Sequence, residues 1–140
     1  MMQFFMGLNY LAIIVSGIAF FFLGFLWYSQ LFGKMWAAEL EKLGLKFNEP
    51  GKGEMVKKML ISLFANTLIA LALAVIIKYL NLQTLSGAFH LALLAGVGIS
   101  AATIMINYNW EGKSLKSFLI DFSHMFVGIF ICSIILINWK

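Results

Sequence analysis

The residues most able to do chemistry lie in the last apolar segment of the chain, residues 115–139. Asp121 and His124 stand inside this segment, where only Lys116 and Asp121 carry a full charge. On a helix, Ser117, Asp121, His124, Gly128 and Cys132 share one face, because they follow one another at helical spacing. A carboxylate in hydrocarbon is costly, so we expect this face to turn toward other helices or toward water.

Three interpretations of the Asp121 and His124 pair remain open. In a structural pair, Asp121 accepts hydrogen bonds from Asn107, Tyr28 or a lysine. In a proton or cation relay, His124 titrates near neutrality and Asp121 tunes it. In a metal site the pair supplies two ligands, but a third from His90 would lie most of a membrane away. We therefore expect no metal and no other cofactor.

Enzyme chemistry has little support in the sequence. The chain contains no His-Glu-x-x-His, Gly-x-Ser-x-Gly or Gly-x-x-x-x-Gly-Lys-Ser/Thr pattern. Cys132 is the single cysteine and lies in the middle of an apolar segment, where a reactive thiolate is disfavoured. We expect a protein that is not an enzyme.

The composition places these residues in a membrane protein. The 140 residues are 62% hydrophobic and 11% charged, whereas soluble domains have about 45–50% apolar and about 25% charged residues. Each of four apolar segments, at about 9–32, 57–79, 85–108 and 115–139, has the length of about 20 residues that crosses a bilayer. The sequence predicts an all-α fold, a single four-helix transmembrane domain over residues 1–140.

The lysines predict how the helices are oriented. Eight lysines lie on the side of the 33–56 loop and the 109–114 turn, and two lie on the opposite side with both termini. Positive residues favour the cytoplasmic side, so we expect both termini to lie outside the cytoplasm. All ten basic residues are lysine, which disfavours nucleic-acid binding because base and phosphate recognition usually recruits arginine.

Depth along the helices predicts where polar side chains gather. A helix rises about 1.5 Å per residue, so the position of a residue in its span gives its depth in the membrane. Most polar side chains of the spans lie in the cytoplasmic half, and one further polar side chain lies near the middle. The candidate intramembrane site comprises Asp121, His124, Tyr28, Ser29 and Asn107, with Asn66 near the middle.

The loop after the first span predicts a short amphipathic helix at about 34–47. Its apolar face comprises Trp36, Leu40, Leu43 and Phe47, and its polar side comprises Glu39, Glu41, Lys42 and Lys46. Such a helix lies in the membrane interface or caps the bundle.

The second and third spans also carry stripes of small residues, such as Ala70 and Ala74 or Ala88 and Ala92. We expect these stripes to pack on each other or on a partner subunit, which favours a homo-oligomer.

Two sequence motifs resemble those of a bacterial membrane-protein family, the domain-of-unknown-function family 1761. The segment from Trp27 to Trp36 is similar to the family elements Trp-Tyr-Ser-Pro and Phe-Gly-Lys-x-Trp, with Gln30 at the proline position, and Trp110-Glu111-Gly112-Lys113 is similar to a second motif. The resemblance implies four membrane helices, a bacterial inner membrane and no assigned activity. The matching motif positions are Trp27, Tyr28, Ser29, Gly33, Lys34, Trp36, Glu111, Gly112 and Lys113.

These observations favour a small transporter or channel-like subunit with a polar site that faces the cytoplasm and accepts a small ion or solute. The alternative is a lipid-binding or scaffolding protein that acts through its interfacial helix and its lysines. An intramembrane enzyme is a third hypothesis, and it lacks a paired nucleophile and base. In every case membrane lipids are partners.

Overall fold

Long helices make up nearly all of the chain that the structure describes. The computed structural model describes residues 5–44 and 51–139. Its helices are α1 (Tyr10–Leu26), η2 (Trp27–Leu31), α2 (Gly33–Glu41), α3 (Lys52–Tyr79), α4 (Leu85–Ala92), η3 (Leu93–Ala101), α5 (Ala102–Glu111) and α6 (Leu115–Asn138). The segments η2 and η3 are π-helical, a wider winding that often occurs at functional positions.

Among the described residues, four continuous helices are long and apolar enough to cross a membrane, which confirms the predicted all-α fold with four such segments. They are Tyr10–Leu31, Lys52–Tyr79, Leu85–Glu111 and Leu115–Asn138. The first, third and fourth agree with the predicted spans to within a few residues. The second begins at Lys52 instead of residue 57, because the lysines at its start extend the helix beyond the apolar segment.

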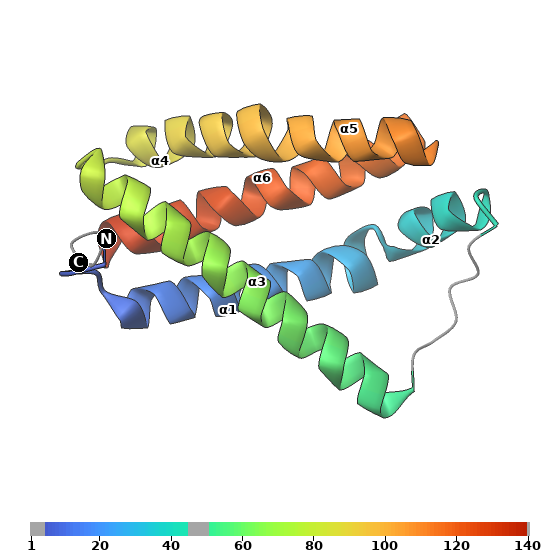
Figure 1. The fold of residues 1–140 in the computed structure, drawn as a ribbon, viewed down its shortest axis with the longest axis horizontal. Helices are drawn as coiled ribbons and strands as arrows, with labels where there is room; N and C mark the ends of the chain where they lie inside the picture. Colours follow the sequence, from blue (N-terminus) through green and yellow to red (C-terminus); the bar gives the residue numbers. More distant parts are fainter. Residues whose placement is uncertain (1–4, 45–50, 140) are drawn as a thin grey trace.

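Polar side chains fix the starts of three helices. Asn9 caps α1, Thr84 caps α4 and Ser114 caps α6, and each side chain accepts a hydrogen bond from the backbone N–H three residues later. Such caps satisfy N–H groups that lack a partner inside the helix. The short connections that precede α4 and α6 make each of these helices antiparallel to the one before it (Figure 1).

Helix α6 is the element on which the others pack. It contacts α1, α2, α3, α4, η3 and α5, and Figure 1 shows it between the α4–α5 helix and α1. The buried face includes Ser117, Gly128 and Cys132, so the polar face predicted for this helix does turn inward. Helix α3 crosses α1 obliquely, and residues 51–62 at its start are all exposed. Both termini lie at one end of the bundle.

Small residues allow close contacts between helices inside the chain. A side chain at Gly17 of α1 would meet Thr67 of α3, and one at Gly96 of η3 would meet the Phe126 ring of α6 at 3.0 Å. The small-residue stripes of the second and third spans were expected to pack on each other or on a partner subunit, and this stays a prediction. Inside the chain, α3 packs on α1 and α6, and α4 and η3 pack on α6, so α6 supplies the shared inner surface.

Candidate functional site

Asp121 lies where three elements meet. Its carboxylate is half-buried on α6 and accepts a hydrogen bond on each oxygen. The hydroxyl of Tyr28 in η2 donates to Oδ1 at 2.6 Å, and the hydroxyl of Tyr108 in α5 donates to Oδ2. Hydrogen bonds to an ionised acceptor are among the stronger ones in proteins. The carboxylate therefore joins the ends of two long apolar helices to α6.

No lysine forms an ion pair with Asp121 within residues 5–44 and 51–139. The Nζ of Lys113 pairs instead with Glu111 at 2.6 Å. The same Nζ lies 4.4 Å from the centre of the Tyr108 ring, where a cation is attracted to the aromatic face. Lys113 therefore supports Tyr108 and leaves the carboxylate with hydrogen bonds but without a contacting cation.

His124 lies one helical turn from Asp121 and is surrounded by aromatic rings. Its ring centre is 5.1 Å from that of Tyr28, 5.3 Å from that of Phe20 and 6.0 Å from that of Trp27. Its Nε2 atom is buried and makes no hydrogen bond in the described part of the chain. A Cβ at Gly24 would lie 3.2 Å from this nitrogen, so the glycine leaves the space that the imidazole occupies.

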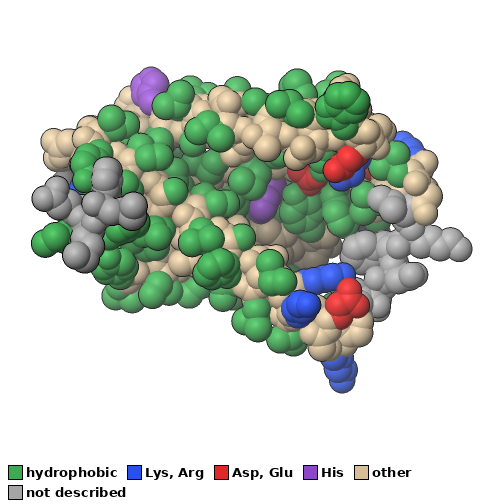
Figure 2. All heavy atoms as spheres, viewed as in Figure 1, with side chains coloured by type: hydrophobic (Ala, Val, Ile, Leu, Met, Phe, Trp, Pro, Cys, Tyr) green, Lys and Arg blue, Asp and Glu red, His purple; other side chains and the backbone are tan. Residues whose placement is uncertain are grey.

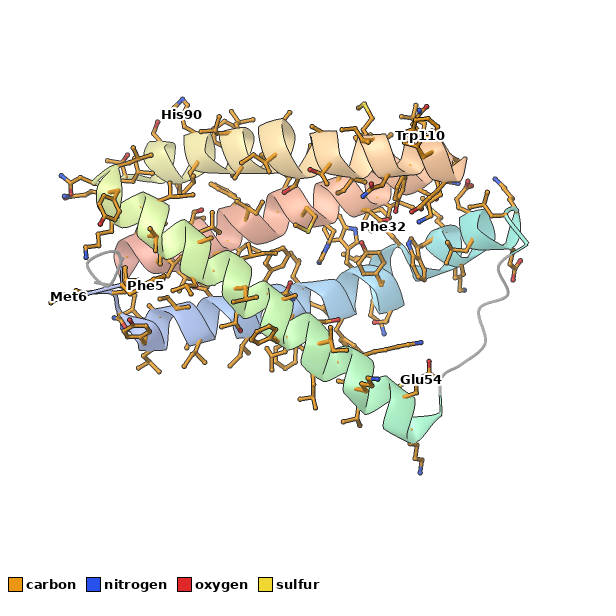
Figure 3. The ribbon with its side chains drawn as sticks, viewed as in Figure 1. Phe5, Met6, Phe32, Glu54, His90 and Trp110 are labelled. Carbon is orange, nitrogen blue, oxygen red and sulfur yellow. The ribbon has the colours of Figure 1, made fainter. Side chains whose placement is uncertain are left out.

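The surface is hollowed beside this site. Figure 2 shows a histidine in a hollow between the helices, framed by hydrophobic side chains. His90 projects from the outside of α4 (Figure 3), so the histidine in the hollow is His124, the second of the two in the chain. Charged side chains gather at the end of the molecule where α2 and the start of α3 lie.

The corner after α1 sets the position of Tyr28. The wider turn of η2 closes with a bond of 2.8 Å from the N–H of Phe32 to the carbonyl of Trp27. Gly33 follows, and a Cβ there would overlap the carbonyl oxygen of Tyr28, so only glycine permits this close approach. The indole of Trp27 donates to the carbonyl of Ile120 at 3.1 Å. These contacts hold η2 against α6 immediately beside Asp121.

Helix α2 is attached to the site by a buried carboxylate. Glu39 is 4% exposed and accepts hydrogen bonds from Lys42 at 2.6 Å and from Ser114 at 2.5 Å. The bonds from Lys42 and then Ser114 hold the pKa of Glu39 below its ordinary value. Since Ser114 also caps α6, Glu39 fixes α2 to the start of the helix that carries Asp121. Trp36 of α2 adds a ring contact with Tyr28 at 5.4 Å between ring centres.

The sequence analysis placed Glu39 on the polar, outward side of this helix, and that prediction is wrong. Glu39 lies three residues after Trp36, so on a helix it shares the face that turns toward the bundle. The described helix ends at Glu41, and residues 45–47 of the predicted helix lie outside the described residues.

The remaining predicted site residues are distributed around this cluster. Ser29 is exposed and donates to the carbonyl of Phe25 in its own helix at 2.6 Å. Asn107 is exposed and Asn66 is half-buried, and neither makes a hydrogen bond to another described residue. Among the motif positions, Lys34 is exposed, and Gly112 ends α5 with a φ of +67°.

Tyr108 is the member of the site that sequence reasoning missed. It follows Asn107, which was predicted to donate to Asp121, and adjacent helical residues point about 100° apart. The aromatic hydroxyl has the longer reach, and it is the one that faces α6. A tyrosine at the same depth as an intramembrane carboxylate was the signal that could have identified it.

Within the described residues, no three His, Cys, Asp or Glu side chains come close enough together to hold a metal ion. A family model with the description "Protein of unknown function (DUF1761)" matches residues 11–137. The match covers the Asp121 cluster and both sequence motifs. No curated protein and no solved structure matches the chain.

Proposed function

Since the chain belongs to the DUF1761 family of proteins of unknown function, we propose a role for it from the chemistry of its own site. The protein is a small transporter or channel-like membrane subunit that binds a proton or a small cation at Asp121. The role is non-enzymatic, and the cluster of Asp121, Tyr28, Tyr108 and His124 is the binding site.

One observation carries this proposal: the Asp121 carboxylate has two phenol donors but no contacting cation among the described residues. An ionised carboxylate inside a membrane segment is costly unless a positive charge compensates it. A proton or a small cation from the aqueous side supplies that compensation. A carboxylate with a purely structural role would instead be expected to pair permanently with a lysine.

His124 gives the site a second group that can bind a proton. Its Nε2 has no partner in the described chain, and it shares with Asp121 the inward face of α6. The two nitrogens of an imidazole can donate and accept a proton. His124 therefore relays a proton between Asp121 and the deeper part of the membrane.

We also propose that both termini lie outside the cytoplasm of a bacterial inner membrane, that α2 lies in the cytoplasmic interface, and that the protein is a homo-oligomer. The lysine distribution supports the orientation. On α2 and directly after it, Met35 and Leu43 are 40% and 38% exposed, and Lys34 and Lys42 are exposed beside them. These side chains also support the alternative function, a lipid-binding scaffold that acts through this helix.

The test is proton and cation flux in vesicles that contain the purified protein and a trapped pH-sensitive dye. Asp121→Asn keeps the shape of the side chain but removes its charge, and we expect it to abolish flux. Glu54→Gln is the matched control, because Glu54 is an exposed acid that pairs with Lys58. We expect this control to retain flux.

Two results would contradict the proposal: flux that is equal in the two variants, or no flux above that of empty vesicles. In either case the scaffold alternative becomes the better account, and weaker binding of an anionic lipid by Lys34→Gln in detergent would be its own test.

A further inference from the structure

A cavity of about 290 Å³ lies at the end of the bundle that holds both termini. It is bounded by residues 7–9, the start of α1, the end of α3, the turn before α4 and the end of α6. Figure 3 shows Met6 at this end and Phe32, which lies beside the Asp121 cluster, well away from it. The volume is close to the lower end, about 300 Å³, of the range for small-molecule sites. Because the cavity lies away from the Asp121 cluster, it is separate from the proposed ion site.

The floor of the cavity is apolar. Its residues are each at most 8% exposed, and they are Ala12, Ala74, Ile77, Leu136 and Ile137. The rim carries Asn9, Lys78, Asn81 and Gln83, together with Trp139. An apolar floor under a polar rim suits an amphiphilic molecule whose polar part stays near the membrane surface.

The rim presents hydrogen-bond donors at Lys78 and Asn81, and two of its side-chain oxygens already accept a bond. The side-chain oxygen of Asn9 accepts from the N–H of Ala12, and that of Asn81 accepts from Gln83 at 2.7 Å. Lys78 donates to the carbonyl of Met6, which uses one of its three N–H donors. No acid pairs with Lys78 within the described residues, and the side-chain N–H groups of Asn81 make no bond to another described residue.

From this geometry we propose that the cavity binds the phosphate headgroup of an anionic membrane lipid. Phosphate oxygens are acceptors, so they complement Lys78 and the Asn81 amide, and the positive charge selects an anion. The glycerol and the first methylenes of the lipid lie on the apolar floor, and the acyl chains continue into the bilayer. Trp139 fits this level, since tryptophan favours the membrane–water interface.

The test is native mass spectrometry of the full chain in detergent, with phosphatidylglycerol and phosphatidylcholine that carry identical acyl chains. We expect phosphatidylglycerol to bind more tightly. Lys78→Gln should weaken its binding about tenfold, the loss of one charge-assisted hydrogen bond. Lys57→Gln is the matched control, because it removes the same charge from the other end of α3, and it should retain binding. Ala74→Leu fills the floor, keeps Lys78, and should also weaken binding.

Equal binding of phosphatidylglycerol by the Lys78→Gln and Lys57→Gln variants would overturn the proposal. Equal binding of the two lipids by the unaltered protein would overturn it too. An excess of inorganic phosphate distinguishes the source of the phosphate. If it displaces the lipid fully and binds on its own with the same affinity, the site takes free phosphate, and the assignment to a lipid is wrong.

Discussion

The contact between Gly128 of α6 and Phe20 of α1 yields a quantitative prediction. A Cβ at Gly128 would overlap three atoms of the Phe20 ring, which is 0% exposed. The ring cannot simply turn away, because it also lies against His124, with 5.3 Å between ring centres. Gly128→Ala therefore forces α1 and α6 apart or pushes Phe20 toward the ion site.

The expected loss of stability is about 2 kcal/mol. Replacing glycine by alanine inside a helix contributes about 1 kcal/mol in favour of folding. Overpacking a core costs about 1–3 kcal/mol, and a methyl group that overlaps three buried ring atoms belongs at the upper end of that range. The difference between these two terms is the predicted loss.

The assay is unfolding in mixed micelles with increasing sodium dodecyl sulfate, followed by circular dichroism. Gly98→Ala is the control, because Gly98 is exposed and a Cβ there would meet one atom, Cδ1 of Leu94, at 4.0 Å. The control should be at least as stable as the unaltered protein. Adding Phe20→Leu to Gly128→Ala should cost less than the two separate losses together, as expected for residues in contact. If Gly128→Ala proves as stable as Gly98→Ala, the packing argument is refuted.

Three further predictions concern the polar contacts at the other end of α6. Tyr108→Phe removes a hydrogen bond to a charged carboxylate and should cost about 1.5–3 kcal/mol in the same unfolding assay, whereas Asn107→Ala should be neutral; equal effects would contradict the assigned donor. Glu39→Gln leaves one acceptor oxygen for Lys42 and Ser114 and removes the charge, so it should weaken the attachment of α2 and speed proteolytic cleavage within α2, with Glu41→Gln as the control. The pKa of Glu39 is lowered in the folded protein from its ordinary value of 4.5, so its contribution is fully present above that pH and is lost as the pH falls through the lower folded value. Cleavage of α2 should therefore increase on acidification below pH 4.5 in the unaltered protein, and it should stay constant there in Glu39→Gln.

Hydropathy predicted the spanning helices well because the bilayer itself imposes their length and composition. The inward turn of the face with Ser117, Gly128 and Cys132 was likewise predictable, since a polar residue such as Asp121 is costly toward lipid. Tyr28 was expected to donate to Asp121, and it does. These are properties of single helices, and helical spacing in the sequence is sufficient to derive them.

The predictions that failed, and the features that were missed, concern how one helix is rotated against another and how two helices are connected. The π-helical turn η2 and the approach of Gly33 to the carbonyl of Tyr28 depend on tertiary contacts, such as that of Trp27 with Ile120. The burial of Glu39 depends on Ser114, which is distant in sequence. A hydropathy pattern assigns a carboxylate to the solvent side. It does not show which residue, distant in sequence, will bond to the carboxylate and make its burial favourable.

The geometry of the cluster indicates which element responds when Asp121 takes up a proton. A protonated carboxyl group is a weaker acceptor than the carboxylate, so its bonds to both tyrosines weaken. Tyr28 remains held, because Trp27 bonds to Ile120 and Trp36 packs on the tyrosine ring. Tyr108 has much less support, since none of the ten residues of α5 is fully buried. Protonation of Asp121 should therefore release α5 rather than η2, and we expect the proposed ion site to open on the side of α5.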